Sequence, residues 1–239
     1  MSEATTLLVI SAHAADFVWR ADGAIATVTA AGGVAKLVAL SYGERGEPGE
    51  LWKEPGQTEE RVKAIRRDEA EKAAEILGAV LEPLDLGDYP LEVNRVAQEG
   101  LTQRLRDFAP TVLLTHARED PFNPDYSVAY QVTEKARQLT MGAGVASAFK
   151  TIKPPDFLLF EPHQPELCGF MPNTFLDITA VFDKKMAAMA EMGAQGYLKE
   201  YYAQRAGTGV TMPGGFCGNA AIQHAEAFQR VSPAVIQGW

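Results

Sequence analysis

Apolar runs and helical spacings follow one another along the chain in a regular order. Short runs rich in Val, Leu, Ile and Phe predict strands at residues 6–12, 35–41, 81–86, 111–116, 156–162 and 174–179. Apolar residues three and four positions apart predict helices at residues 16–33, 61–78, 96–108, 127–139, 182–205 and 219–228. Such alternation is typical of an α/β fold with a mostly parallel, Rossmann-like sheet. We expect a single α/β domain over residues 1–239, with helices on both faces of the sheet.

The pattern indicates a functional role for two loops and for one edge of the sheet. Residues 42–60 are rich in Gly, Pro and Glu and too long for a simple connection, and the glycine-rich residues 213–219 predict a mobile loop. No G-x-G-x-x-G motif follows the first strand, which argues against a dinucleotide cofactor. In sheets of this kind ligands bind beyond the carboxyl ends of the strands. We expect the 42–60 loop to meet His13, Asp16, His116 and His163 there.

Composition and net charge exclude some classes of binding partner. The net charge of -9, with no run of Lys or Arg, argues against nucleic acid, although a few local arginines could still bind a small anionic substrate. The only cysteines, Cys168 and Cys217, have no zinc-binding spacing and favour a reducing compartment. No apolar run reaches the roughly 18 residues of a membrane span, and no secretory leader is recognisable. We therefore expect a cytoplasmic protein with no membrane partner; a homo-oligomer remains open.

The segment "SAHAADF" at residues 11–17 places a histidine and an aspartate three positions apart at a strand end, as in half of a metal site. It resembles the PIG-L/LmbE-like superfamily of zinc-dependent de-N-acetylases, which carries His-Pro-Asp-Asp-Glu there. In that family the His and the second Asp bind zinc, and the first Asp activates water. By position, His13 and Asp16 match the ligands, while Ala15 replaces the base. The resemblance therefore implies a metal site without the usual hydrolytic base.

Longer blocks resemble one branch of this superfamily, the 4-oxalomesaconate hydratases of gallate and protocatechuate meta-cleavage. These blocks are "SAHAADFVWR", "GERGE" (43–47), "LWKEPGQT", "GDYPL" (87–91), "FEPHQ" (160–164) and "TFLDIT" (174–179). The resemblance implies a hydro-lyase that adds water to a conjugated C=C, converting 4-oxalomesaconate to 4-carboxy-4-hydroxy-2-oxoadipate. Two alternatives are a metal-dependent de-N-acetylase and a metal-free relative that binds or converts another carboxylate metabolite.

Hydration of such a substrate needs a base for the water, an acid for the neighbouring carbon and an electrophile for the enolate charge. We predict Glu47 as the base, with Glu44 as its substitute, and His163 as the acid. Candidates for binding the substrate carboxylates are Arg45, Arg20, His116, Arg118 and Asn123.

The third metal ligand is open. The superfamily has an Asp-His pair after the fourth strand, and this chain has Asp125 and Tyr126. A phenol is a poor ligand for Zn²⁺ at neutral pH because its pKa is near 10. Tyr126 could bind a harder metal, His116 or Asp125 could supply the ligand, or the metal could be weak or absent. We expect a divalent metal, Zn²⁺, at His13 and Asp16, with Tyr126 as the positional candidate for the third ligand.

Overall fold

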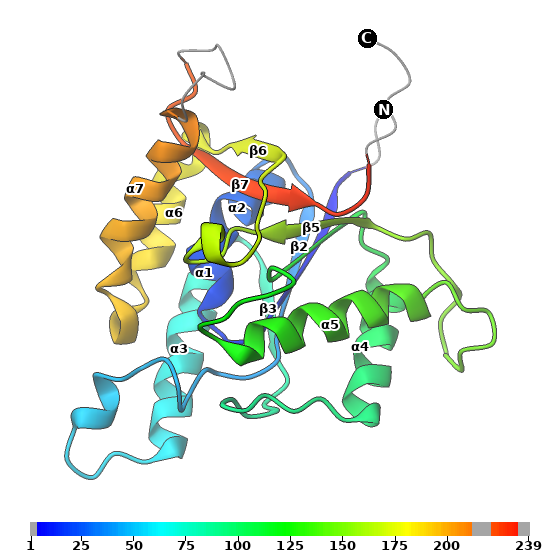
Figure 1. The fold of residues 1–239 in the computed structure, drawn as a ribbon, viewed down its shortest axis with the longest axis horizontal. Helices are drawn as coiled ribbons and strands as arrows, with labels where there is room; N and C mark the ends of the chain where they lie inside the picture. The colour runs from blue at the N-terminus through cyan, green and yellow to red at the C-terminus, as the bar shows by residue number, and fades with distance from the viewer. Residues whose placement is uncertain (1–3, 212–220, 234–239) are drawn as a thin grey trace.

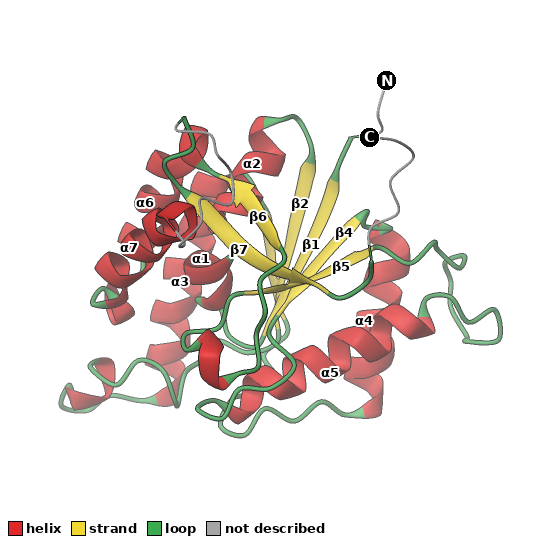
Figure 2. Cartoon of the chain, turned by 45° about the horizontal axis from the view of Figure 1, so that its top comes forward, coloured by secondary structure: helices red, strands yellow, loops and turns green. Residues whose placement is uncertain are grey.

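The computed structural model describes residues 4–211 and 221–233, whose centre is a seven-stranded sheet (Figures 1 and 2). The strands are β1 (Thr6–Ser11), β2 (Val34–Ala39), β3 (Val80–Pro83), β4 (Val112–Thr115), β5 (Asp156–Phe160), β6 (Thr174–Asp177) and β7 (Ala225–Arg230). Their order is β3-β2-β1-β4-β5-β7-β6. The first five pair in parallel, and β7 pairs antiparallel with both β5 and β6. The predicted mostly parallel α/β architecture is confirmed.

Helices cover both faces of the sheet, as Figure 2 shows. One face carries α1 (Asp16–Arg20), α2 (Asp22–Ala30), α3 (Glu59–Leu77), α6 (Phe182–Ala190) and α7 (Leu198–Thr211), and the other carries α4 (Arg95–Phe108) and α5 (Pro124–Leu139). Along β1, Leu7 and Val9 pack into the first core, whereas Leu8 and Ile10 pack into the second. Because successive strand residues face opposite sides, one apolar run builds both cores.

Four single-turn 3₁₀ helices complete the described elements: η1 (Leu51–Lys53), η2 (Pro165–Leu167), η3 (Thr179–Val181) and η4 (Gly193–Gln195). The 42–60 loop contains η1 and otherwise has no helix or strand until α3 begins. No helix in the described ranges has the length and apolar character needed to cross a membrane.

Three predicted helices differ from the structure. The helix at 16–33 is two helices, because Ala21 leaves the helical conformation with φ of -144°. The helix at 182–205 divides into α6, η4 and α7, and the break includes Gly193 and Gly196, poor formers of helix interiors. The helix at 219–228 is wrong, since residues 225–230 form β7, where neighbouring strands override a weak local preference. The mobile loop predicted at 213–219 lies outside the described residues.

The late strand β7 is tied to the first helices by a buried ion network. Glu226 of β7 accepts hydrogen bonds of 2.8 Å from the backbone N–H groups of Gly23 and Ala24 at the start of α2. Lys185 of α6 forms ion pairs with both Asp22 and Glu226, and all three side chains are buried. The network joins three elements that are far apart in the sequence.

Candidate active site

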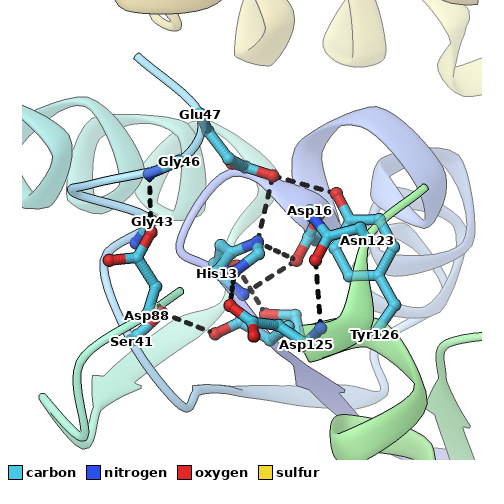
Figure 3. A network of polar contacts seen from close by, with 12 residues as sticks. His13, Asp16, Ser41, Gly43, Gly46, Glu47, Asp88, Asn123, Asp125 and Tyr126 are labelled. Atoms are coloured by element: carbon cyan, nitrogen blue, oxygen red, sulfur yellow. Dashed lines mark hydrogen bonds and ion pairs between the residues drawn. The ribbon is translucent and has the colours of Figure 1, made fainter. Parts of the chain in front are cut away.

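The carboxyl ends of three parallel strands bring a polar cluster together (Figure 3). His13 follows β1, Glu47 lies in the loop after β2, and Asp125 and Tyr126 begin α5 beyond β4. Asn123 caps this helix by accepting from the Asp125 backbone N–H at 3.1 Å. Parallel strands direct these connections to the same edge of the sheet, as ligand sites in such folds require.

His13 is fully buried and has a carboxylate at each ring nitrogen. Its Nδ1 lies 3.0 Å from Glu47 Oε1, and its Nε2 lies 3.1 Å from Asp125 Oδ2. Asp125 is fixed by the backbone N–H groups of Tyr89 and Leu91, which donate to it at 3.0 and 2.9 Å. Burial lowers the pKa of His13, but the Glu47 charge and the bonds to both carboxylates outweigh burial and raise it well above its ordinary value. The site thus favours positive charge.

Three ligand atoms around this point fit a divalent cation. Asp16 Oδ2 accepts from the His13 backbone N–H at 2.8 Å and lies 3.6 Å from His13 Nδ1. These two atoms and a Glu47 oxygen all lie within 4.8 Å of one another. A tetrahedral cation with bonds of about 2.0–2.1 Å holds neighbouring ligand atoms about 3.3 Å apart, close to the distances here. The Asp125 carboxylate on the opposite imidazole nitrogen completes the usual carboxylate–histidine–metal arrangement.

A second acidic group overlaps the first. His13, Asp88 and Asp125 also offer atoms within 4.8 Å of one another. Both oxygens of Asp88, however, accept backbone hydrogen bonds from Arg45 at 3.0 Å, and Oδ2 accepts another from Gly46 at 2.9 Å. Asp88 therefore holds the Glu47 loop in place. The same loop needs Gly43, whose φ is +71° and where a Cβ would lie 2.9 Å from His13 Cβ.

Tyr126 contacts Glu47 through a hydrogen bond. Its hydroxyl donates to Glu47 Oε1 at 2.9 Å, and its ring stacks on His116 with centroids 4.2 Å apart. Burial first, then the charges of Asp16 and Glu47, raise the pKa of Tyr126 well above 10, so the phenol keeps its proton. Tyr126 is therefore a hydrogen-bond donor to Glu47 and offers no phenolate to a cation.

His116 lies beneath Tyr126 and supports the cluster. Its Nε2 accepts from the Ala12 backbone N–H at 2.9 Å and lies 3.2 Å from Asp16 Oδ2. Burial lowers its pKa despite the Asp16 charge. Because the ring is fully buried, it contacts Asp16 and Tyr126 rather than open space.

Arg66 of α3 was missed from the sequence. It is fully buried, and its Nη2 donates to Glu47 Oε2 at 3.2 Å and to Gln195 at 2.8 Å. Burial raises the pKa of Glu47, but the charges of His13 and Arg66 outweigh burial and leave it below its ordinary value. The available signal was spacing, since Arg66 stands four residues before Ala70 and eight before Ala74, on the apolar face of the helix.

Three sequence candidates lie outside the cluster. The Arg45 side chain is about half exposed and pairs with Glu59, and the exposed Arg118 donates to the Tyr130 hydroxyl at 3.2 Å. The buried Glu44 carboxylate pairs with Lys63 at 3.4 Å. The motif places Arg45 and Glu44 near the site in sequence, but the turn of the loop directs their side chains elsewhere.

A cavity of about 360 Å³ adjoins the cluster, and Trp19, Arg20, Glu161, Tyr202 and Arg205 are among its lining residues. The Arg20 guanidinium lies 4.5 Å from the centre of the Tyr126 ring, so Arg20 connects the cavity with the cluster. His163 lies behind Tyr202, with its Nδ1 3.5 Å from the Tyr202 hydroxyl. Tyr126 and His163 do not line the cavity themselves, but each contacts a residue that does, Arg20 and Tyr202 respectively.

A family model described as "PIG-L: GlcNAc-PI de-N-acetylase" matches residues 8–137, which is more than half of the chain and includes His13, Asp16, Glu47 and Asp125. The chain belongs to the PIG-L family. Within this family it is 43% identical over 233 residues to the 4-oxalmesaconate hydratase of Pseudomonas putida, covering 96% of this chain and 90% of that protein. The family predicted from the sequence motifs is confirmed.

Two solved structures have the same fold. The crystal structure of GalB, the 4-carboxy-2-hydroxymuconate hydratase from Pseudomonas putida, superimposes with a TM-score of 0.94 at 41% identity, over 98% of this chain and 99% of that one. The N,N'-diacetylchitobiose deacetylase of Pyrococcus horikoshii superimposes with a TM-score of 0.78 at 19% identity, over 95% and 84% of the two chains. The second likeness shows only the shared fold.

Proposed function

We propose that this PIG-L protein is a hydro-lyase that adds water to the conjugated C=C of an unsaturated oxo-tricarboxylate. The expected substrate is 4-oxalomesaconate, and the expected product is 4-carboxy-4-hydroxy-2-oxoadipate. The observation that carries the proposal is the position of Glu47, whose carboxylate reaches the His13 cluster from the loop after β2. At the position of the deacetylase base, the chain has the buried Ala15. The similarity to two hydratases supports the same reaction class.

His13 and Asp16 would hold the divalent metal, Zn²⁺ in this proposal, and Asp125 would orient the imidazole. When bound, the metal supplies a Lewis acid that polarises water or a substrate oxygen. Glu47 is the most exposed of the three carboxylates around His13, at 8% against 2% for Asp16 and 1% for Asp125. Glu47 is therefore the carboxylate of the cluster best placed to accept the proton of the attacking water.

In the proposed reaction one proton leaves the attacking water and one proton is added to the substrate. Glu47 takes one proton from water, the hydroxide oxygen bonds to the carboxylate-bearing alkene carbon, and the neighbouring carbon receives a proton from His163. Tyr126 and Arg66 hold the two oxygens of Glu47 in fixed positions. Their hydrogen bonds also stabilise the negative charge that Glu47 carries before the transfer.

The assignment is tested by incubating the purified protein with 4-oxalomesaconate and following loss of the conjugated chromophore, with metal content measured by plasma mass spectrometry. Near-stoichiometric metal with chromophore loss is expected. Release of acetate from an N-acetyl sugar without hydration would support the deacetylase alternative. Binding of carboxylates without turnover or metal would support the metal-free alternative.

Glu47→Gln is expected to lower the turnover rate by roughly 10²-fold or more while the bound metal is retained, because the amide keeps the shape but cannot accept the proton. Steady-state kinetics and metal analysis measure the two effects. Glu59→Gln, which removes the same charge from a partly exposed residue, is the matched control. Loss of the metal in Glu47→Gln would instead identify Glu47 as a ligand, and wild-type turnover would reject both roles.

His163 predicts a pH dependence. Burial, followed by the charges of Arg20 and Arg205, lowers its pKa below the ordinary 6.5. The acid form is present below this pKa, so kcat/KM should fall as the pH rises through it. The dependence is measured as a pH–rate profile of wild type and His163→Asn, and the variant should be slower by roughly 10²-fold and lack this limb. An unchanged limb in the variant would assign the acid to another group.

A further inference from the structure

Three cationic side chains line the cavity beside the cluster, and they differ in their partners. Arg205 forms an ion pair with Glu161, and Lys185 forms ion pairs with Asp22 and Glu226. Among the described residues, Arg20 has no ion pair. Its Nε and Nη1 also lack hydrogen-bond partners there, although the side chain is only 7% exposed.

An unpartnered buried guanidinium is costly, because Arg stays charged and its N–H groups have lost water. The ring of Tyr126, 4.5 Å away, compensates only part of this cost through a cation–π contact. An anionic ligand would satisfy both the charge and the free donors, and a carboxylate matches the planar fork of the guanidinium. The exposed Glu166 lies at the edge of the same cavity, where solvent screens its charge.

We propose that this cavity is a carboxylate-binding subsite in which Arg20 binds one carboxylate of the substrate. The inference rests on the proposed hydratase function and specifies how its anionic substrate is recognised. Arg205 contributes less to binding the carboxylate, because its ion pair with Glu161 already neutralises its charge. The ion pair holds Glu161 against Arg205, so the charge of this carboxylate is compensated and does not repel the ligand.

The location of Arg20 suits a substrate that spans both proton-transfer groups. The Tyr126 side chain touches Arg20 with its ring and Glu47 with its hydroxyl. On the other side, Tyr202 lines the cavity and lies 3.5 Å from His163. A carboxylate bound at Arg20 would also neutralise the charge that lowers the pKa of His163, which favours the acid form. Apolar wall residues such as Phe170 and Phe175 complete a lining for a carbon chain.

The test measures binding of tricarballylate, a stable saturated tricarboxylate, to the metal-loaded protein by isothermal titration calorimetry. Arg20→Gln is expected to raise the Kd at least about tenfold, since a charge-assisted bond is lost. Arg67→Gln removes an exposed arginine of α3 that pairs with Glu71, and serves as the charge-matched control with an unchanged Kd. A wild-type Kd in Arg20→Gln would overturn the subsite.

Should Arg20→Gln not fold, Arg20→Lys replaces it. Lysine keeps the charge but loses the two-pronged donor geometry, so a raised Kd supports the subsite and a wild-type Kd overturns it. Kinetics separate this inference from the function on which it rests. Hydration by wild type with an unchanged KM in the Arg20 variant would reject the subsite alone. Arg20-dependent tricarballylate binding without hydration would reject the hydratase and leave an anion-binding site.

Discussion

Replacing Lys185 with methionine is expected to lower the free energy of unfolding by roughly 3–5 kcal/mol, because the change leaves buried carboxylates without their cation. Lys185 is 2% exposed and pairs with Asp22, which is fully buried, and with Glu226 at 3.0 Å. Methionine fills a similar volume, so the loss is electrostatic rather than a cavity. The network also links α2, α6 and β7, so its disruption should affect a large part of one face.

Urea unfolding of wild type and variant gives this difference from the midpoints and slopes. Lys72→Met is the matched control, because Lys72 also forms an ion pair, with Asp68 at 2.7 Å, but on the exposed side of α3. Its unfolding curve should be nearly unchanged, since solvent screens exposed pairs. Equal unfolding curves for Lys185→Met and wild type would mean that the buried network does not stabilise the fold.

Replacing His13 with alanine is expected to reduce bound metal to a small fraction of the protein and to slow hydration by about 10³-fold or more, since a Lewis acid contributes several kcal/mol to catalysis. His13 Nδ1 is the nitrogen donor of the proposed ligand set, and without it Asp16 is the one proposed ligand that remains. Metal analysis after purification without chelator measures the first effect, and chromophore loss measures the second.

His224→Ala is the histidine control, because His224 stacks on Phe182 with ring centroids 3.6 Å apart, away from the cluster residues. It should retain both metal and turnover. Asp125→Asn is an intermediate case, in which metal affinity should weaken by roughly 10–100-fold because only the imidazole's orienting partner changes. Full metal content in His13→Ala would place the ion elsewhere or remove it from the mechanism.

The strands were more predictable than the later helices. Parallel strands covered on both faces require continuous apolar runs, and β1 shows such a run in the sequence. The strand β7 reads "AEAFQR", where Glu226 would suggest an exposed position. Its burial depends on Lys185 and the start of α2, which lie far away in the sequence. A pattern read along one segment does not contain such distant partners.

The sequence predicted the part of the site whose residues stand within local motifs. His13, Asp16 and Glu47 stand in recognisable segments, and the ends of parallel strands bring them to one edge. The contact of Arg66 with Glu47 depends on how α3 packs against the loop, which no local spacing specifies. Arg45 was expected to bind substrate because it stands close to Glu47 in the motif. In the structure its backbone N–H holds the loop through Asp88, and its side chain pairs with Glu59.

The contact of Glu226 with the start of α2 has a consequence for how the molecule assembles during translation. Two of the backbone N–H groups at this helix start donate to Glu226, which stands 203 positions after Gly23 and 202 positions after Ala24. Helix starts left without partners are weak points of a folding chain. The helix that follows the His13 segment is therefore completed only after β7 has been synthesised, so a nascent chain that stops before β7 has the His13 and Glu47 segments without this supporting contact.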